Sequence, residues 1–386
     1  MSDASFHQSP LLGGPAPVFD VEATDGNARA GKLRLARGTI ETPIFMPVGT
    51  VGSVKMMDPT ELNDVGAQII LGNTYHLYLR PGKEVLEHAG GLHRWMGWDK
   101  PMLTDSGGFQ FFSLAHLAKF GEDGVRFKSH IDGSHHHFTP ESVMAMQAAI
   151  GSDIRMVLDH VLALPASREA LEDAMRRSTR WALRCLDAPR ESGTAVFAIL
   201  QGGTDHALRA RHRDDLCGHD FDGFAIGGLS VGEPPEVMYE VLNRLAPTMP
   251  QHKPRYLMGV GTPRDIVRAI AEGVDMFDCV MPTRNARNGT VFTRDGRLNL
   301  RNAQHRLSER ALDDECTCYA CRTFSRGYIH HLVRSKESLG PRLLSVHNLH
   351  YYLDLVREAR AAIQSGVFSQ WQQATEARWD AASESS

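Results

Sequence analysis

Two carboxylates of this chain lie within or at the end of short apolar segments. Asp278 interrupts the run Met276 to Met281, and Asp105 ends the run Pro101 to Asp105. An unpaired carboxylate in a buried strand is costly, so each aspartate either forms an ion pair or a cap, or serves chemistry. Two carboxylates at the anomeric carbon of a sugar can divide the work of a displacement, one as nucleophile and one as acid and base.

The residues after Asp278 indicate a phosphate-bearing substrate. Pro282 and Thr283 follow it, and then Arg284 and Arg287, whose guanidinium groups can bind phosphate in a bidentate manner. A reactive carboxylate beside such a loop predicts covalent chemistry on a nucleotide.

Polar residues and glycines end several other apolar runs. The ring of Phe109 can stack on a flat ligand, and glycines beside it let the backbone approach. Asp159 can accept hydrogen bonds from the amine and ring N–H of guanine, and Gln201 can both donate and accept. Each residue alone could be a strand-end cap, but together they predict a pocket for a base. The predicted pocket consists of Ser106, Gly107, Gly108, Phe109, Asp159, Gln201 and Gly228.

Three cysteines within six residues, Cys316, Cys318 and Cys321, predict a zinc site. Zinc takes four ligands, and the histidines near enough in sequence are at 330, 331 and 347. We expect His347 to complete the site, because a distant ligand would tie the later helical segment to the cysteine loop. A closed site with four protein ligands leaves no water to activate, so one structural Zn²⁺ per chain is expected.

Eight apolar runs of strand length must position these residues, and most are followed by a helical stretch with a capped start. They cover 44–49, 68–73, 101–105, 153–159, 195–201, 223–228, 256–261 and 276–280. The helix starts expected from their caps are at Pro59, Pro140, Ser167, Pro235 and Pro263.

This alternation indicates a parallel sheet covered on both faces. Eight units fit a (β/α)₈ barrel better than an open doubly wound sheet, and no G-x-G-x-x-G motif follows a strand. The predicted fold class is therefore α/β, a (β/α)₈ TIM barrel, with a small antiparallel cap at 18–42 in front of it. The carboxyl ends of the strands then meet at one rim.

The domain organisation follows from this pattern. We expect a single catalytic barrel domain at 17–376, with a zinc-binding subdomain at about 283–350 and flexible tails at 1–16 and 377–386. Residues 283–310 hold seven arginines against two acids and include a hairpin with Asp-Gly at its turn. A solvated basic face is the ordinary interpretation, but beside a catalytic rim the run favours an RNA-binding surface. A helical segment from 343 to about 364 follows.

Composition limits the remaining possibilities. A hydrophobic content of 42% and a charged content of 23% are typical of a globular protein, and no apolar run is long enough for a membrane span. The formal net charge of -4 speaks against a globally basic surface, so any RNA contact is local. The N-terminus lacks the features of a secretory signal, and the isolated cysteines at 185, 217 and 279 suit a reducing cytoplasm, where we expect the protein.

In order along the chain, these motifs resemble the tRNA-guanine transglycosylase family from about residue 18 to 370. The matching segments are Asp105-Ser-Gly-Gly-Phe-Gln, Gln201-Gly-Gly, Gly227-Gly-Leu, Leu257-Met-Gly-Val-Gly261, Met276-Phe-Asp-Cys, Pro282-Thr-Arg and Cys-x-Cys-x-x-Cys with Val346-His347-Asn348.

The resemblance implies a barrel enzyme that exchanges the wobble guanine of tRNA for a 7-deazaguanine base through a covalent enzyme–tRNA intermediate, in queuosine biosynthesis. Asp278 would be the nucleophile and Asp105 the general acid and base, while Phe109, Asp159, Gln201 and Gly228 would hold the base. Zinc would be bound by Cys316, Cys318, Cys321 and His347. The anticodon loop would contact Gly259, Val260, Gly261, Thr262, Pro263, Arg264, Asp265, Thr283, Arg284, Asn285, Ala286 and Arg287. Bacterial members usually act as homodimers, which we expect here.

Several pocket residues depart from the bacterial pattern. Phe109 stands where bacterial members usually have tyrosine, and Val161 where they have cysteine, as in queuine-using enzymes. Val231 instead resembles the bacterial enzymes. We expect 7-aminomethyl-7-deazaguanine to be the favoured base, with queuine as the alternative.

Two other functions are open to such a sequence. A barrel glycoside or nucleoside hydrolase would use the same two carboxylates, but it has no use for the arginine run or the zinc site. A non-catalytic, tRNA-binding partner subunit should lack one of the carboxylates, whereas both are present here.

Overall fold

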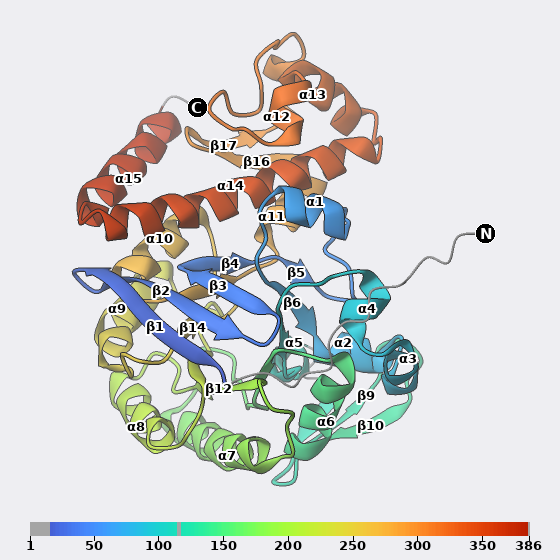
Figure 1. The fold of residues 1–386 in the computed structure, drawn as a ribbon, viewed down its shortest axis with the longest axis vertical. Coiled ribbons are helices and arrows are strands. Elements are labelled where there is room, and N and C mark those ends of the chain that lie inside the picture. The colour runs from blue at the N-terminus through green and yellow to red at the C-terminus, as the bar shows by residue number, and fades with distance from the viewer. Residues whose placement is uncertain (1–15, 114–116, 385–386) are drawn as a thin grey trace.

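The computed structural model describes residues 16–113 and 117–384, so the predicted N-terminal tail lies outside the described residues up to residue 15. Its central sheet has nine parallel strands in the order β4-β15-β14-β13-β12-β11-β7-β6-β5 (Figure 1). The strands are β4 (Ile44–Met46), β5 (Val48–Gly49), β6 (Ile70–Asn73), β7 (Met102–Asp105), β11 (Ile154–Met156), β12 (Ala195–Leu200), β13 (Gly223–Ile226), β14 (Arg255–Leu257) and β15 (Met276–Asp278).

The first and last strands of this order are two halves of one segment. β4 pairs with β15 and β5 pairs with β6, and only Pro47 separates the halves. Proline has no N–H for the strand ladder, so it interrupts the strand without opening the barrel. The predicted eight-unit barrel is confirmed, with its first strand divided.

Helices cover the barrel, and all five starts expected from caps are confirmed. Asp58 and Glu61 form a capping box at α1, and Thr262 and Asp265 form another at α10. The helices up to this point are α1 (Pro59–Asp64), α2 (Thr74–Leu79), α3 (Lys83–Ala89), α4 (Leu92–Met96), α5 (Gly108–Ser113), α6 (Pro140–Ile150), α7 (Arg168–Asp187), α8 (His206–Cys217), α9 (Pro235–Leu245), η2 (Ala246–Thr248) and α10 (Pro263–Ala271).

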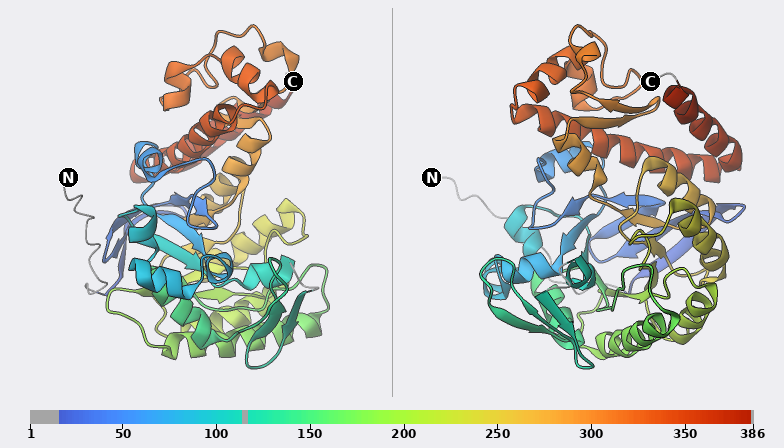
Figure 2. Two further views of the ribbon diagram at one scale, coloured as in Figure 1. Left: turned by 90° about the vertical axis from the view of Figure 1, so that its right-hand side faces the viewer. Right: turned by 180° about the vertical axis from the view of Figure 1, so that it is seen from behind.

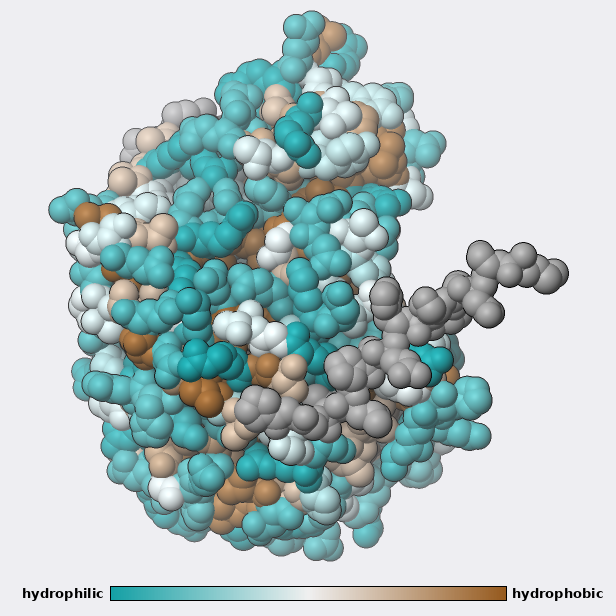
Figure 3. All heavy atoms as spheres, in the orientation of Figure 1, coloured by the Kyte–Doolittle hydropathy of each residue, from teal (hydrophilic) through white to brown (hydrophobic). Residues whose placement is uncertain are grey.

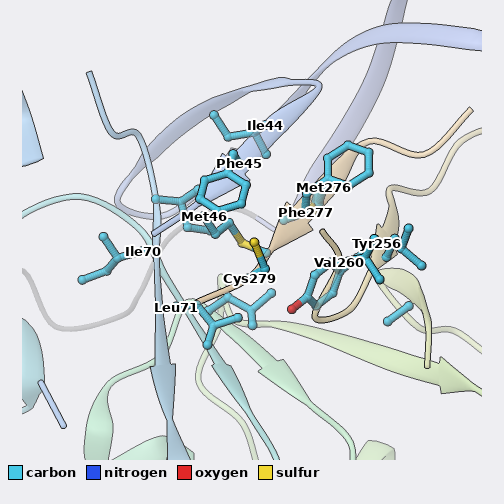
Figure 4. Close-up of a cluster of buried hydrophobic side chains, with 14 of the residues drawn as sticks. Ile44, Phe45, Met46, Ile70, Leu71, Tyr256, Val260, Met276, Phe277 and Cys279 are labelled. Atoms are coloured by element: carbon cyan, nitrogen blue, oxygen red, sulfur yellow. The ribbon is translucent and has the colours of Figure 1, made fainter. Parts of the chain in front are cut away.

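Apolar side chains of neighbouring strands fix the position of β15. Figure 4 shows Phe45 and Met46 of β4 beside Leu71 of β6 and Phe277 of β15, all of them buried. The phenol of Tyr256, from β14, lies among them with its oxygen at the edge of the cluster. This packing holds the strand that ends in Asp278.

The predicted antiparallel cap is confirmed as a three-stranded sheet, β1 (Val18–Asp25), β2 (Ala28–Leu35) and β3 (Gly38–Thr42). Arg29 of β2 pairs with Asp275 and donates to the carbonyls of Gln251 (2.9 Å) and Lys253 (3.0 Å). These partners precede β14 and β15, so the cap covers the amino ends of the barrel strands. Figure 3 shows that, where described residues are drawn, this face is mainly hydrophilic with separate hydrophobic patches.

A second antiparallel sheet was not predicted. β8 (Ala118–Phe120), β9 (Val125–Lys128) and β10 (His135–Phe138) form an insertion between β7 and α6. Each strand is short and mixes polar with apolar residues, so it lacks the continuous apolar run used to find the barrel strands. Figure 2 (left) places this sheet on the opposite side of the molecule from β1–β3.

The C-terminal part forms a layer against the barrel. It contains α11 (Met281–Arg287), the predicted hairpin β16 (Thr290–Thr293) and β17 (Gly296–Asn299), η3 (Ala303–His305), α12 (Tyr319–Thr323), α13 (Arg326–Arg334) and the long α14 (Leu339–Gln364). None of the helices within the described ranges has the length and apolar content to span a bilayer.

The predicted C-terminal tail is wrong as far as residue 384, because α15 spans Phe368–Glu384. Trp379 is buried, and its Nε1 donates to the hydroxyl of Tyr351 at 3.1 Å. Arg378 pairs with Asp295 and Glu315 at 2.6 Å each. The polar composition that suggested a tail instead supplies the ion pairs that dock the helix. Residues 385–386 lie outside the described residues.

Candidate active site

Asp278 ends β15 with its orientation fixed by two donors. Its Oδ1 accepts from the hydroxyl of Tyr256 at 2.6 Å and from the N–H of Gly259 at 2.7 Å. Burial raises the pKa of Asp278, and these two hydrogen bonds oppose the rise. Because both donors bind one oxygen, they orient the other without occupying it.

Asp105 ends β7, and its carboxylate accepts hydrogen bonds from residues at the start of α2. Its Oδ1 accepts from the N–H of Thr74 at 2.9 Å, and the amide of Asn73 donates to Oδ2. Burial raises the pKa of Asp105 to about 7, the Thr74 bond opposes this, and the negative charge of Asp278 raises it further. A carboxyl that titrates near neutral pH beside a second carboxylate can transfer protons at physiological pH.

The predicted base-binding residues contact one another. Nε2 of Gln201 donates to Oδ2 of Asp159 at 2.6 Å, and Oγ of Ser106 lies 3.5 Å from its Oδ1. Burial raises the pKa of Asp159 to about 6, against the Gln201 bond. A Cβ at Gly108 would lie 2.2 Å from Oδ1 of Asp159, and one at Gly228 would lie 2.3 Å from Oε1 of Gln201. Both positions therefore require glycine.

Two further predicted pocket residues lie at the start of α5. Gly107 has a φ of 86°, in the region that favours glycine. Phe109 is 52% exposed, and its ring contacts Phe112 with centroids 5.4 Å apart. Stacking of a base on Phe109 stays a prediction.

The cysteine cluster comes together as predicted. The Sγ atoms of Cys316, Cys318 and Cys321 and a ring nitrogen of His347 lie within 4.8 Å of one another, and all four residues are buried. Nδ1 of His347 lies 3.2 Å from Sγ of Cys321, while its Nε2 is 2.8 Å from the carbonyl oxygen of Phe292. A hydrogen bond at one ring nitrogen that orients the other is typical of metal-binding histidines. The group could therefore hold a metal ion.

Comparisons with known proteins agree with this geometry. A family model described as Queuine tRNA-ribosyltransferase matches residues 24–381. The chain belongs to this family. Proteins named Queuine tRNA-ribosyltransferase from Nitratidesulfovibrio vulgaris (strain DP4) and Thiobacillus denitrificans (strain ATCC 25259 / T1) are 56% and 54% identical over 362 and 353 residues. These alignments cover 93% and 92% of this chain and 96% of each relative.

In this member of the queuine tRNA-ribosyltransferase family, the expected RNA-contacting residues are of two kinds. Arg284 and Arg287 are exposed on α11, directly after β15. Arg264 instead pairs with Glu376 (3.3 Å) and Asp380 (2.5 Å) of α15. Thr262 and Asp265 cap α10, and the side chains of Val260, Pro263, Thr283 and Ala286 are buried. The arginines of α11 are therefore the better-placed cations.

Three positioning residues of this family member were missed by the sequence analysis. Asn73 and Tyr256 bind the two carboxylates. Arg209 of α8 is 1% exposed and donates to the carbonyls of Leu200 (2.8 Å), Gly203 (2.7 Å) and Gly228 (3.2 Å). Asn73 ended a predicted strand and could have been found. Tyr256 and Arg209 instead form hydrogen bonds with elements that only the fold brings next to them.

Proposed function

We propose that this chain is a tRNA-guanine transglycosylase that replaces the wobble guanine of tRNAs with GUN anticodons by a 7-deazaguanine base. The observation that carries this proposal is the placing of Asp278 and Asp105 at one barrel rim, close enough that the charge of Asp278 raises the pKa of Asp105. The hydrogen-bonded pair Asp159 and Gln201 lies beside them.

The reaction is a double displacement. Oδ2 of Asp278 attacks C1′ of the ribose, the bond from C1′ to N9 of guanine breaks, and its electron pair leaves with guanine as Asp105 supplies a proton. The incoming base then loses its N9 proton to Asp105 and attacks C1′, which breaks the ester to Asp278. Tyr256 and Gly259 hold the nucleophile in the required direction throughout.

The test separates exchange from hydrolysis. Incubation with unmodified tRNA and labelled guanine should incorporate label into the RNA, because the covalent intermediate is resolved by a base. Release of guanine without incorporation, leaving an abasic ribose, would instead identify a hydrolase. Binding of tRNA with neither reaction would indicate a non-catalytic subunit.

We infer that the pocket prefers 7-aminomethyl-7-deazaguanine over queuine, which carries an added ring. Val161 is buried, and a Cβ at Gly232 would lie 2.7 Å from the carbonyl oxygen of Leu164. The segments around Val161 and Val231 are thus in close contact, which favours the smaller base. A misfitted group costs about 1–3 kcal/mol, or roughly 10–200-fold in kcat/KM. Competition between the two bases at equal concentration measures the preference, and a kcat/KM for queuine at or above that of the smaller base contradicts it.

We propose that the cluster of Cys316, Cys318, Cys321 and His347 holds one Zn²⁺. Three thiolates and an imidazole are a donor set typical of closed structural zinc sites, in which the metal stabilises the fold. His347 and Asn348 of α14 both bind β16, through the Phe292 carbonyl and N–H. The ion would therefore fasten the cysteine loop to a helix already joined to the hairpin.

Replacement of Cys318 by alanine should lower zinc content to well under one per chain and lower the melting temperature. A zinc site contributes about 10–16 kcal/mol of folding free energy in small peptides, and less here because the barrel has its own core. Metal analysis and thermal unfolding provide the measurement, with Cys217→Ala, outside the cluster, as the matched control. Full zinc occupancy in the Cys318 variant would exclude this ligand.

We further infer that the protein acts in the cytoplasm as a homodimer. Exposed apolar side chains at Val51, Met56 and Leu339 lie near the junction of the barrel and the C-terminal layer, where Met56 and Leu339 line one cavity. Light scattering of the purified protein tests the dimer, and a monomeric mass at micromolar concentration contradicts it.

A further inference from the structure

The outer face of the β8–β10 sheet gathers positive charge. The strand register places Lys119 opposite Arg126, Arg126 opposite His137, and Lys128 opposite His135. Directly paired residues point to the same face of a sheet, and these five side chains are all exposed. Like charges set directly opposite one another destabilise a sheet. An anion lying over this face would remove that cost.

Two acidic residues in the turns of the sheet have partners of their own. Glu122, in the turn between β8 and β9, binds Arg180 of α7. Asp132, in the turn between β9 and β10, accepts from the hydroxyl of Ser134 at 2.7 Å. Within the described ranges, none of the cations Lys119, Arg126 and Lys128 forms an ion pair. The charge of this face is therefore available to a partner.

The sheet stands at the catalytic end of the barrel. It is inserted after β7, whose carboxyl end carries Asp105, and the opposite end is covered by β1–β3 (Figure 2, left). The insertion contacts elements that carry the site: the hydroxyl of Tyr75, in α2, lies 3.0 Å from Nδ1 of His130, in the turn between β9 and β10. A Cβ at Gly107 would lie 3.6 Å from the ring of Phe138. The outer face thus belongs to the same end of the molecule as the arginines of α11.

We propose that the face formed by Lys119, Arg126, Lys128, His135 and His137 binds the sugar-phosphate backbone of tRNA outside the anticodon stem-loop. This inference rests on the proposed function. Ammonium, guanidinium and imidazole groups all donate hydrogen bonds to phosphate oxygens and read no base sequence from there. Cross-strand neighbours about 5 Å apart form a continuous row of hydrogen-bond donors that includes three cations, which complements a chain of phosphates.

A double variant, Arg126→Gln with Lys128→Gln, tests the proposal on two substrates. With full-length unmodified tRNA, KM should rise at least about tenfold at about 0.1 M salt, and the slope of log affinity against log salt should become shallower by about two. With the isolated anticodon stem-loop, KM should stay unchanged, and kcat should be unchanged on both. The matched control is Arg211→Gln with Arg244→Gln, on the outer helices α8 and α9.

Each other outcome overturns the proposal. An unchanged KM for full-length tRNA means that this face does not touch RNA, and an equal rise with the stem-loop places the contact within the anticodon stem-loop. A change of oligomeric state in the double variant, measured by light scattering, makes the face a protein interface. If the unaltered chain fails to exchange guanine in the stem-loop, the proposed function itself fails.

Discussion

Replacement of Asp278 by alanine should abolish guanine exchange and leave tRNA binding nearly unchanged. The alanine variant has no oxygen to attack C1′, so kcat should fall by at least about 10³-fold. The contacts that we expect tRNA to make with Arg284 and Arg287, which are exposed on α11, do not involve this carboxylate. Exchange of labelled guanine gives the rate, and a filter-binding assay gives the affinity.

A covalent adduct makes this test specific. The unaltered protein, mixed with tRNA and no free base, should yield a protein–RNA species that survives a denaturing gel, and the alanine variant should yield none. Asp220→Ala, whose side chain is 95% exposed at the amino end of β13, serves as the control and should behave like the unaltered protein. An adduct formed by the Asp278 variant would assign the nucleophile to another residue. Asn is a poorer substitute than Ala, because deamidation would restore the acid.

Replacement of Asp105 by asparagine should lower kcat by about 10²–10⁴-fold, the usual contribution of a general acid or base. The same variant should also lose the decline of kcat/KM at high pH that the carboxyl group of Asp105 produces. Since the pKa of Asp105 is raised to about 7, the carboxyl is protonated below that pH and can protonate leaving guanine; the acid form is lost as pH rises. We therefore expect kcat/KM of the unaltered protein to decline above about pH 7.

Stability gives an independent check on the same group. A carboxyl whose pKa is raised from 3.8 to about 7 holds its proton more tightly in the folded state, so it destabilises the fold as pH rises between these values. Asp105→Asn should remove this effect and leave thermal stability at pH 8 equal or higher.

The kinetic test has its own contrary outcome. A pH profile of kcat/KM that keeps its decline in the Asn variant would show that another group supplies the proton.

The barrel could be predicted because its strands are buried on both faces and therefore read as apolar runs, of which the wholly buried β12 is the clearest case. Asp105, Asp159 and Asp278 could be found because each breaks or ends such a run. The β8–β10 sheet could not, because a strand with one exposed face mixes apolar and charged residues over too few positions. Helix α15 could not be predicted for a related reason. It packs on the C-terminal layer through ion pairs as much as through apolar contacts.

The partners of the site residues were harder to predict than the residues themselves. Arg209 lies within a helix, and nothing in its sequence neighbourhood indicates that its guanidinium reaches three carbonyls around the pocket. Tyr256 lies in a strand, where an aromatic residue ordinarily packs in the core, and its hydroxyl reaches Asp278 only because β14 and β15 are neighbours. Such contacts depend on the closed barrel and not on local pattern.

The pairing of β4 with β15 means that the barrel can close only late in synthesis of the chain. Asp278 pairs in register with Met46, so the proposed nucleophile belongs to the last barrel strand to leave the ribosome, and its neighbour belongs to the first. Until β15 emerges, β4 and β14 each expose an unpaired edge that invites association with other chains. Pairing over such a sequence separation is slow to form. A nascent chain released before Met276 would lack both the nucleophile and the strand that seals the barrel.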